Sequence, residues 1–360
     1  MVTAKASWLD AAAEARLEGR HGVAAQAYLE ALALDPADAT SLRGLYYLPL
    51  AAEERQTLLP QLRQRIEGAP AHPLALSLLA HWLREKELAT ALALNRQAAR
   101  QGVAPMRLAL PGGAAAAAGG LPEVVILGAP KSGTTSLAAY LAGHPQVWLH
   151  PLKELHFFDN HWGLGEEWYR SQFPPLRSPG VLRLEATPDY LQHPQTPGRM
   201  RELMPEARLI VLLREPLDRA LSWLRHMRGL VGLQGETEEL LKEEVQQLER
   251  MGEAELSGLG WIRPNALSGS LYAHQLRRWQ AVWPSSQLLL LRFEDLALQP
   301  EGVLRRCLAF LNLEDSGLAR WRSYPVHNQG QLPVDTIDPV LARRCREGVL
   351  AEALELWTAL

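Results

Sequence analysis

The feature that most restricts the fold is a strand–loop–helix pattern at residues 124–136. Four apolar residues with β propensity, Val124 to Leu127, run directly into a loop bounded by Gly128 and Gly133. A helix-compatible stretch from Thr134 to Ala142 follows the loop. Free backbone N–H groups and the helix dipole converge at such a junction and make it a binding site for phosphate. The pattern therefore predicts an α/β fold with an anion site at the start of this helix.

The position of the lysine in this loop separates two classes of phosphate-binding enzyme. Nucleotide triphosphatases and kinases place lysine directly after the second glycine, but this chain has Thr134 there and carries Lys131 inside the loop. The string from Pro130 to Thr135 resembles the 5′-phosphosulfate loop of sulfotransferases, which use 3′-phosphoadenosine-5′-phosphosulfate (PAPS). A nucleotide kinase is the alternative. The resemblance implies that the 5′ phosphate is surrounded by Lys131, Ser132, Gly133, Thr134, Thr135 and Ser136.

A second strand–helix junction further along the chain predicts a site for another phosphate. The apolar run Arg208 to Arg214 ends in a cation, and a proline begins the helix that follows. We expect Arg214 and Ser222 to face one crevice at the carboxyl edge of the sheet, where an arginine fork and a hydroxyl suit a phosphate monoester. The spacing from Leu213 to Ser222 resembles the 3′-phosphate motif of sulfotransferases. Pairing of Arg214 with Asp218, as a strand cap, is the alternative.

Three further segments place the resemblance nearest the carbohydrate (heparan sulfate) branch of PAPS-dependent sulfotransferases. They are His150 to Asp159, Glu185 to Tyr190, and Ser270 to Trp279 with the strand Gln287 to Arg292 after it. In that order, they are similar to the family's segment with the catalytic glutamate, to its Glu-Lys-Thr-Pro-x-Tyr turn, and to its late Ser-Leu-Tyr helix and strand. The resemblance spans roughly residues 122–340, and its motifs occur in the family's order.

The resemblance implies a chemistry and a set of roles. PAPS is the implied donor, 3′,5′-ADP is the product, and no metal is required because Lys131 and the loop amides replace it. Lys131 is implied to stabilise the leaving phosphate, and Glu154 to act as general base for an acceptor hydroxyl or amine. In an extended segment His156 would point the same way as Glu154, where it orients the acceptor or shares proton traffic. Tyr272 is implied to contact the donor. Alternatively, Glu154 is a surface carboxylate paired with Lys153.

The chain departs from the heparan pattern at two places. Ala186 stands where those enzymes have the turn lysine, so Lys153 or an arginine takes over its role, or the acceptor is less anionic. The late Lys-Gly-Arg loop is replaced by the stretch 328–333, in which Gln329 and Gly330 are the expected donor contacts. Gly330 still permits a close backbone approach to the 3′ phosphate. The acceptor therefore stays open among a glycan, a lipid or polyketide hydroxyl, and a small metabolite.

The N-terminal part of the chain has a different, helical pattern. Its spacing of aromatic, alanine and proline residues resembles the tetratricopeptide repeat, and a similar frame recurs about two repeat lengths later. The two sets are Trp8, Ala24, Tyr28, Ala31 and Pro36, and then Leu78, Trp82, Ala91 and Ala98. We expect about three stacked repeats, with Leu42 to Ile66 as the degenerate middle one, that recruit a protein or carrier partner. An unrelated helical bundle is the alternative.

These patterns predict three parts of the chain. Residues 1–110 form an all-α helical-repeat domain, and residues 111–121 form an alanine–glycine linker. Residues 122–360 form an α/β catalytic domain, with a P-loop-type parallel sheet flanked by helices as in the sulfotransferase fold. A non-catalytic scaffold with an inactive catalytic domain is the alternative function. The acidic stretch 229–264 is interpreted as a solvated face or, alternatively, a lid over the acceptor.

Composition excludes several other classes. The 360 residues carry a net charge of −3, which does not favour a nucleic-acid partner. Two cysteines, Cys307 and Cys345, are too few for a disulfide framework and have no metal-ligand spacing. We find neither a signal-peptide pattern nor an apolar run long enough to span a membrane. The expected enzyme is soluble and cytoplasmic.

Overall fold

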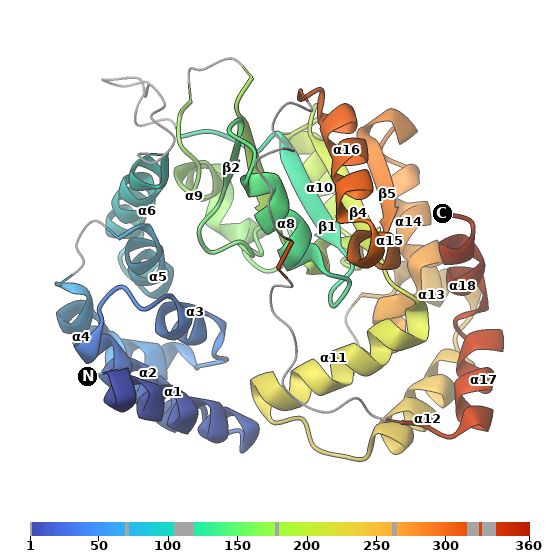
Figure 1. Ribbon diagram of the computed structural model, residues 1–360, viewed down its shortest axis with the longest axis horizontal. Helices are drawn as coiled ribbons and strands as arrows, with labels where there is room; N and C mark the ends of the chain where they lie inside the picture. The colour runs from blue at the N-terminus through green and yellow to red at the C-terminus, as the bar shows by residue number, and fades with distance from the viewer. Residues whose placement is uncertain are drawn as a thin grey trace.

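The computed structural model describes residues 2–68, 72–103, 119–176, 180–260, 265–314, 324–325 and 336–360. Most of the expected linker, and the expected donor contacts Gln329 and Gly330, lie outside the described residues. The described chain consists of an N-terminal group of helices followed by a parallel sheet with its own helices (Figure 1).

Six helices precede the sheet. They are α1 (Val2–Leu17), α2 (His21–Leu34), α3 (Ala39–Tyr47), α4 (Ala52–Ile66), α5 (Pro73–Leu83) and α6 (Leu88–Val103). Gly19, with φ 70°, lies in the turn between α1 and α2, and Pro36 lies just beyond the end of α2. The small residues Ala24 and Ala31 are completely buried, so adjacent helices approach closely. The all-α character of this region is confirmed, while its relation to the tetratricopeptide repeat stays a prediction.

The sheet contains five strands in the order β2-β3-β1-β4-β5, and every pairing is parallel. The strands are β1 (Val124–Gly128), β2 (Val147–Leu149), β3 (Leu182–Ala186), β4 (Arg208–Leu213) and β5 (Leu288–Arg292). The chain passes from β1 to one side of the sheet and then crosses to β4 on the other side. The carboxyl ends of β1 and β4 therefore lie next to each other at a reversal of strand order, where open α/β sheets bind ligands.

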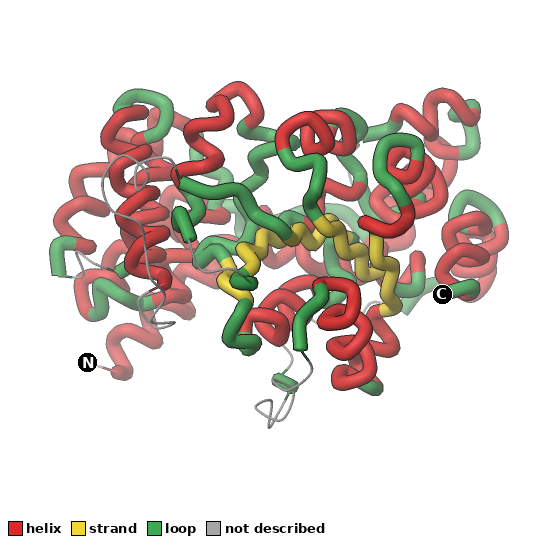
Figure 2. Tube along the Cα trace, turned by 90° about the horizontal axis from the view of Figure 1, so that it is seen from above, coloured by secondary structure: helices red, strands yellow, loops and turns green. Residues whose placement is uncertain are grey.

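Helices cover both faces of the sheet, and the strands form one layer between them (Figure 2). Alternate residues of β1 enter two separate cores: Val125 and Leu127 pack with Trp279, whereas Val124 and Ile126 pack with Leu137. Burial on both faces explains why β1 and β4 are nearly continuous apolar runs. The remaining helices are α8 (Thr134–Ala142), α9 (Gly165–Ser171), α10 (Thr196–Leu203), α11 (Pro216–Val231), α12 (Thr237–Leu248), α13 (Glu253–Gly258), α14 (Tyr272–Gln280), α15 (Phe293–Leu298), α16 (Pro300–Leu311), α17 (Pro339–Glu347) and α18 (Ala351–Thr358).

The acidic stretch contains α12 and α13, and α12 is only partly a solvated face. Glu244 is buried and accepts hydrogen bonds from the backbone N–H groups of Ala266, Leu267 and Ser268 at 3.0, 2.9 and 2.8 Å. The interpretation as a purely solvated charge run is therefore wrong at Glu244. Through these three hydrogen bonds Glu244 anchors α12 to the turn before α14.

Both cysteines are buried and free of a disulfide. Among the described residues, no helix combines the length and the apolar character that crossing a membrane would require.

Candidate active site

The loop between β1 and α8 has the geometry of an anion site. Gly133 caps α8 with a φ of 83°, and a Cβ built there would lie 2.7 Å from the ring of Phe293. Both the positive φ and the lack of space require glycine at this position. Ser132 and Thr134 are buried, while Thr135 and Ser136 lie in the first turn of α8. The first N–H groups of a helix have no intrahelical acceptor, and a helix N-terminus is therefore suited to bind an anion.

Lys131 is the cation of this loop. Burial lowers its pKa to about 8, while the charge of Glu154 acts in the opposite direction. The charges of Arg225, Lys153 and Arg214 lower its pKa further. Lysines and arginines from four separate positions of the chain thus influence one another here, which is an environment suited to a ligand with several negative charges.

Arg214 joins the second predicted phosphate motif to the first. Its Nη1 donates to the backbone carbonyl of Lys131 at 3.5 Å, and its guanidinium lies over the ring of Phe293. The hydroxyl of Tyr272, which is completely buried, donates to the carbonyl of Arg214 at 3.0 Å. Tyr272 therefore fixes the backbone of Arg214 through this hydrogen bond.

The alternative, in which Arg214 pairs with Asp218, is wrong: the described residues contain no ion pair between these two side chains. The carboxylate of Asp218 lies 3.9 Å from Nη2 of Arg346 instead. Ser222 lies on α11 and is buried. Arg214 follows β4 at the carboxyl edge of the sheet, so its guanidinium is left beside the phosphate loop.

Glu154 lies in a segment of turns that follows β2. Its side chain is 25% exposed, and Oε1 lies 2.5 Å from Nζ of Lys153. Burial would raise the pKa of Glu154, but the charges of Lys153 and His156 outweigh it and lower the pKa. Glu154 is therefore a carboxylate at neutral pH, the form that accepts a proton. Its pairing with Lys153 was expected of a surface residue, yet the same charge also reaches Lys131.

The segment is not extended, so the condition under which His156 would point the same way as Glu154 is not met. Lys153 and His156 have φ values of 66° and 52°, in the left-handed region. The alternation of side chains that applies to a strand therefore does not apply here. Glu154 and His156 are nevertheless electrostatically coupled, because each charge shifts the other's pKa.

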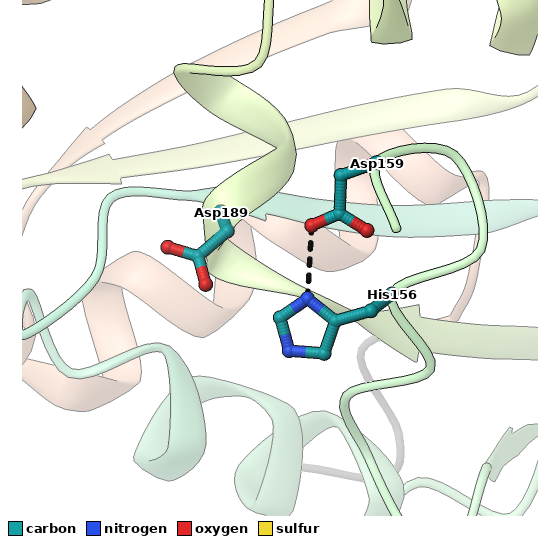
Figure 3. A group of neighbouring side chains, drawn as sticks. All are labelled: His156, Asp159 and Asp189. Atoms are coloured by element: carbon teal, nitrogen blue, oxygen red, sulfur yellow. Dashed lines mark hydrogen bonds and ion pairs between the residues drawn. The ribbon is translucent and has the colours of Figure 1, made fainter. Parts of the chain in front are cut away.

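His156 lies between two aspartates (Figure 3). Its Nδ1 is 2.9 Å from Oδ2 of Asp159, and Asp189 faces the ring from the turn after β3. Burial lowers the pKa of His156, but the two aspartates and Glu154 together raise it to about 9. Burial also raises the pKa of Asp189 to about 7. One ligand atom from each of the three side chains lies within 4.8 Å of the others, a spacing that would allow a metal ion. A protonated imidazole between two carboxylates explains the same spacing.

The turn after β3 holds residues 150–159, the segment that contains Glu154, through side chains to which the sequence motif assigned no role. Thr187 Oγ1 accepts from the N–H of Leu155 at 3.0 Å, and the hydroxyl of Tyr190 accepts from the N–H of Phe157 at 2.8 Å. Both hydroxyls in turn donate to the buried carboxylate of Glu185 at 2.8 Å. Burial raises the pKa of Glu185 to about 7.

Tyr46 and Tyr47 were also missed. Their hydroxyls donate to the backbone carbonyls of Glu154 and Leu152, although the two tyrosines lie more than a hundred positions earlier in the chain. No local spacing links tyrosines on a helix to such acceptors, so only the tertiary structure could find them.

Comparisons with known proteins agree with this geometry. A sequence profile described as the sulfotransferase domain matches residues 121–323, which is more than half of the chain. The chain therefore belongs to the sulfotransferase family and is an enzyme of the transferase class.

Curated relatives include proteins that act on heparan sulfate. The chain is 32% identical over 199 residues to heparan sulfate glucosamine 3-O-sulfotransferase 3B1 of Mus musculus, covering 54% of this chain and 47% of the relative. It is 28% identical over 266 residues to membrane-associated sulfotransferase kil1 of Dictyostelium discoideum, covering 54% and 56%. The chain thus spans about half the length of these relatives.

One solved structure supports the fold directly. The sulfotransferase from Alicyclobacillus acidocaldarius superposes with a TM-score of 0.51 and 26% sequence identity, covering 66% of this chain and 96% of that structure. The expected parallel sheet flanked by helices is confirmed both by the sheet order and by this likeness.

Proposed function

We propose that this enzyme transfers a sulfuryl group from PAPS to an acceptor hydroxyl or amine, with 3′,5′-ADP as the product. The observation that carries the proposal is the meeting of two phosphate motifs at adjacent strand ends, where Arg214 hydrogen-bonds to the carbonyl of Lys131. A nucleotide with phosphates at both its 5′ and 3′ positions needs two such anion sites side by side.

The residues present fit this donor. The phosphate loop and the start of α8 offer Lys131, the hydroxyl side chains from Ser132 to Ser136 and the helix N-terminus to the 5′ group. Arg214 and Ser222 offer a cation and a hydroxyl to the 3′ group. When bound, PAPS supplies a sulfuryl group attached to a phosphate leaving group. The predicted further contacts at Gln329 and Gly330 remain a proposal.

Two groups of the chain are assigned to the chemistry itself. Glu154 takes the proton from the acceptor, since its lowered pKa keeps it ionised at neutral pH. Lys131 places positive charge beside the phosphate that leaves, and binding of that phosphate favours the protonated lysine. His156, held by Asp159, is cationic at neutral pH and orients the acceptor next to Glu154.

The acceptor is proposed to be a glycan or a smaller hydroxyl or amine compound. Relatives named for heparan sulfate favour a glycan. The lysine expected of that branch is Ala186 here, and the N–H of Ala186 donates to the carbonyl of Lys153 at 3.4 Å. Lys153 is thus a replacement cation next to Ala186 in the fold, but its side chain is paired with Glu154. We therefore propose an acceptor that is less anionic than heparan.

The test is a comparison of donors followed by a screen of acceptors. We expect 3′,5′-ADP to bind much more tightly than 5′-AMP or ATP in calorimetry, and labelled PAPS to deliver its sulfuryl group to at least one glycan, hydroxyl or amine compound. A preference for ATP would support the nucleotide kinase instead. Donor binding without transfer to any acceptor in the screen would support the inactive scaffold.

Recruitment of a protein or carrier partner through α1–α6, and a cytoplasmic location, also stay proposals. A pull-down with the helical region and fractionation of cells would test them.

A further inference from the structure

Two adjacent tyrosines of α3 bind the backbone on either side of Lys153. The hydroxyl of Tyr46 donates to the carbonyl of Glu154 at 2.7 Å, and the hydroxyl of Tyr47 donates to the carbonyl of Leu152 at 3.0 Å. Buried carbonyl groups need such partners, because leaving one unsatisfied costs about 1–3 kcal/mol. The N-terminal helices therefore supply hydrogen bonds to the backbone of the proposed general base.

The backbone at this point is strained. Lys153, between the two bonded carbonyls, has φ 66°, and His156 has φ 52°. A residue other than glycine in this region costs on the order of 1–3 kcal/mol and persists only where its surroundings fix it. Thr187 and Tyr190 fix the segment from the side of the sheet, and Tyr46 and Tyr47 fix it from the opposite side.

The two tyrosines are themselves held in place. The ring of Tyr46 packs at 5.0 Å from the ring of Tyr47 and at 4.5 Å from the ring of His81 on α5. The side chain of Leu152 is 2% exposed and belongs to the hydrophobic core of the helical region rather than to a core of the sheet. Backbone and side chain of the segment are thus both anchored in α1–α6.

Contacts at both ends keep the helical region against the sheet domain. At one end α1 meets α11, where a Cβ on Gly232 would lie 2.8 Å from the backbone nitrogen of Gly19. At the other end, Asn95 on α6 donates to Ser171 on α9 at 3.2 Å, in a buried position. In Figure 1 the tyrosine-bearing α3 lies between these two ends. The region is therefore docked along its length.

We propose that Tyr46 and Tyr47 are positioning residues of the sulfuryl-transfer site, which hold Glu154 in its reactive place from the helical region. This inference rests on the proposed role of Glu154 as general base. It makes α1–α6 a wall of the catalytic site in addition to any role in binding partners. Misplacement of a reacting group by about 1 Å costs on the order of 100-fold in rate, so loss of both hydroxyls should be felt mainly in turnover.

The test uses the full chain with Tyr46→Phe and Tyr47→Phe combined, because phenylalanine keeps the ring contacts and removes only the hydroxyls. Tyr28→Phe is the matched control: Tyr28 is a buried tyrosine of α2, and its hydroxyl accepts from Arg16 instead. Hydrogen exchange followed by mass spectrometry is measured on peptides that cover residues 150–158. We expect exchange there to be at least about tenfold faster in the double variant, and unchanged in the control.

Turnover gives the second measurement, with PAPS and an acceptor found in the screen. We expect kcat to fall about 10–100-fold in the double variant, with the affinity for 3′,5′-ADP within about twofold of wild type. The same pair of substitutions is then added to Glu154→Gln. Positioning through Glu154 predicts no further loss in that background, because the proton-accepting group is already absent.

Three outcomes would overturn the inference: wild-type exchange at 150–158, wild-type kcat, or a loss that multiplies fully with that of Glu154→Gln. Failure of the proposed function has a different signature. There, the wild-type chain would transfer nothing from PAPS, or Glu154→Gln would keep full activity, while the exchange experiment would still report whether the tyrosines hold the segment.

Discussion

The phosphate loop and residues 150–159, the segment that contains Glu154, are built in opposite ways, although the charge of Glu154 reaches Lys131 of the loop. The loop, residues 128–133, is shaped by its own residues: a preceding strand, a glycine cap and a following helix. The segment with Glu154 has no regular structure, and hydroxyls of Tyr46, Tyr47, Thr187 and Tyr190 hold its backbone. A local motif thus makes the proposed donor side, whereas distant parts of the chain cooperate to make the proposed acceptor side.

This contrast predicts whether a substitution changes mainly donor binding or mainly turnover. Changes in the loop should alter donor binding, because the loop is proposed to contact the donor in the ground state. Changes in the segment should alter turnover, because its carboxylate acts only when the acceptor reacts. Four further experiments test this division, in order of expected size.

The largest effect is expected for Glu154→Gln. Glutamine keeps the shape of the side chain but does not accept a proton, and a general base contributes about 10²–10⁴-fold to turnover. We expect kcat for PAPS-dependent transfer to fall by that factor while the Kd for 3′,5′-ADP stays within about twofold. Nearly full activity would assign the proton to another group, and His156→Ala should then show the larger loss.

Arg214→Ala should give the next largest effect, on binding. Loss of a charged hydrogen bond costs about 1.5–3 kcal/mol, which corresponds to a weakening of roughly 10–150-fold for 3′,5′-ADP in calorimetry. Binding of 5′-AMP, which has no 3′ phosphate, should change much less. Equal losses for both nucleotides would mean that Arg214 does not contact the 3′ phosphate.

The pH dependence of donor binding should identify Lys131. Its pKa is lowered to about 8 in the free protein by burial, and a bound phosphate favours the protonated lysine. Affinity for 3′,5′-ADP should therefore fall about tenfold between pH 7 and pH 9. Lys131→Met should bind more weakly at every pH and lose this dependence. An unchanged pH profile in Lys131→Met would assign the titration to a different group.

The smallest effect concerns stability and the pair His156–Asp159. The pKa of His156 is about 9 when folded, above its ordinary value, because Asp159, with smaller contributions from Asp189 and Glu154, outweighs burial. The contribution of protonated His156 to the free energy of unfolding is therefore complete below about pH 6.5 and is lost as pH rises through 9. We expect a loss on the order of 1 kcal/mol in urea unfolding, since His156 is partly exposed to water.

Asp159→Asn is the matched control for this pair. Without the carboxylate, the pKa of His156 should return toward its ordinary value, and the decrease in stability above pH 6.5 should vanish. Persistence of the decrease in Asp159→Asn would show that other groups cause it.

Sequence reasoning succeeded where neighbouring residues make the structure. The strand at β1, the helix from Thr134 to Ala142 and the helix that begins at Pro216 were all predicted with nearly their observed bounds. It was wrong where burial changes the meaning of a residue. Glu244 looked like one carboxylate of a solvated run, but it is buried and caps the turn at 266–268.

By itself, the sequence determined the helical and α/β parts, the phosphate loop with Lys131, and the arginine that follows β4. These depend on periodicity, on glycine at a positive φ and on contiguous motifs, which act over short stretches of chain. Only the tertiary structure decided that His156 lies between Asp159 and Asp189, and that Tyr46 and Tyr47 bind the backbone around Glu154. The physical reason is that a buried carbonyl or a charged ring takes whatever partner the packed chain brings near it, however distant in sequence.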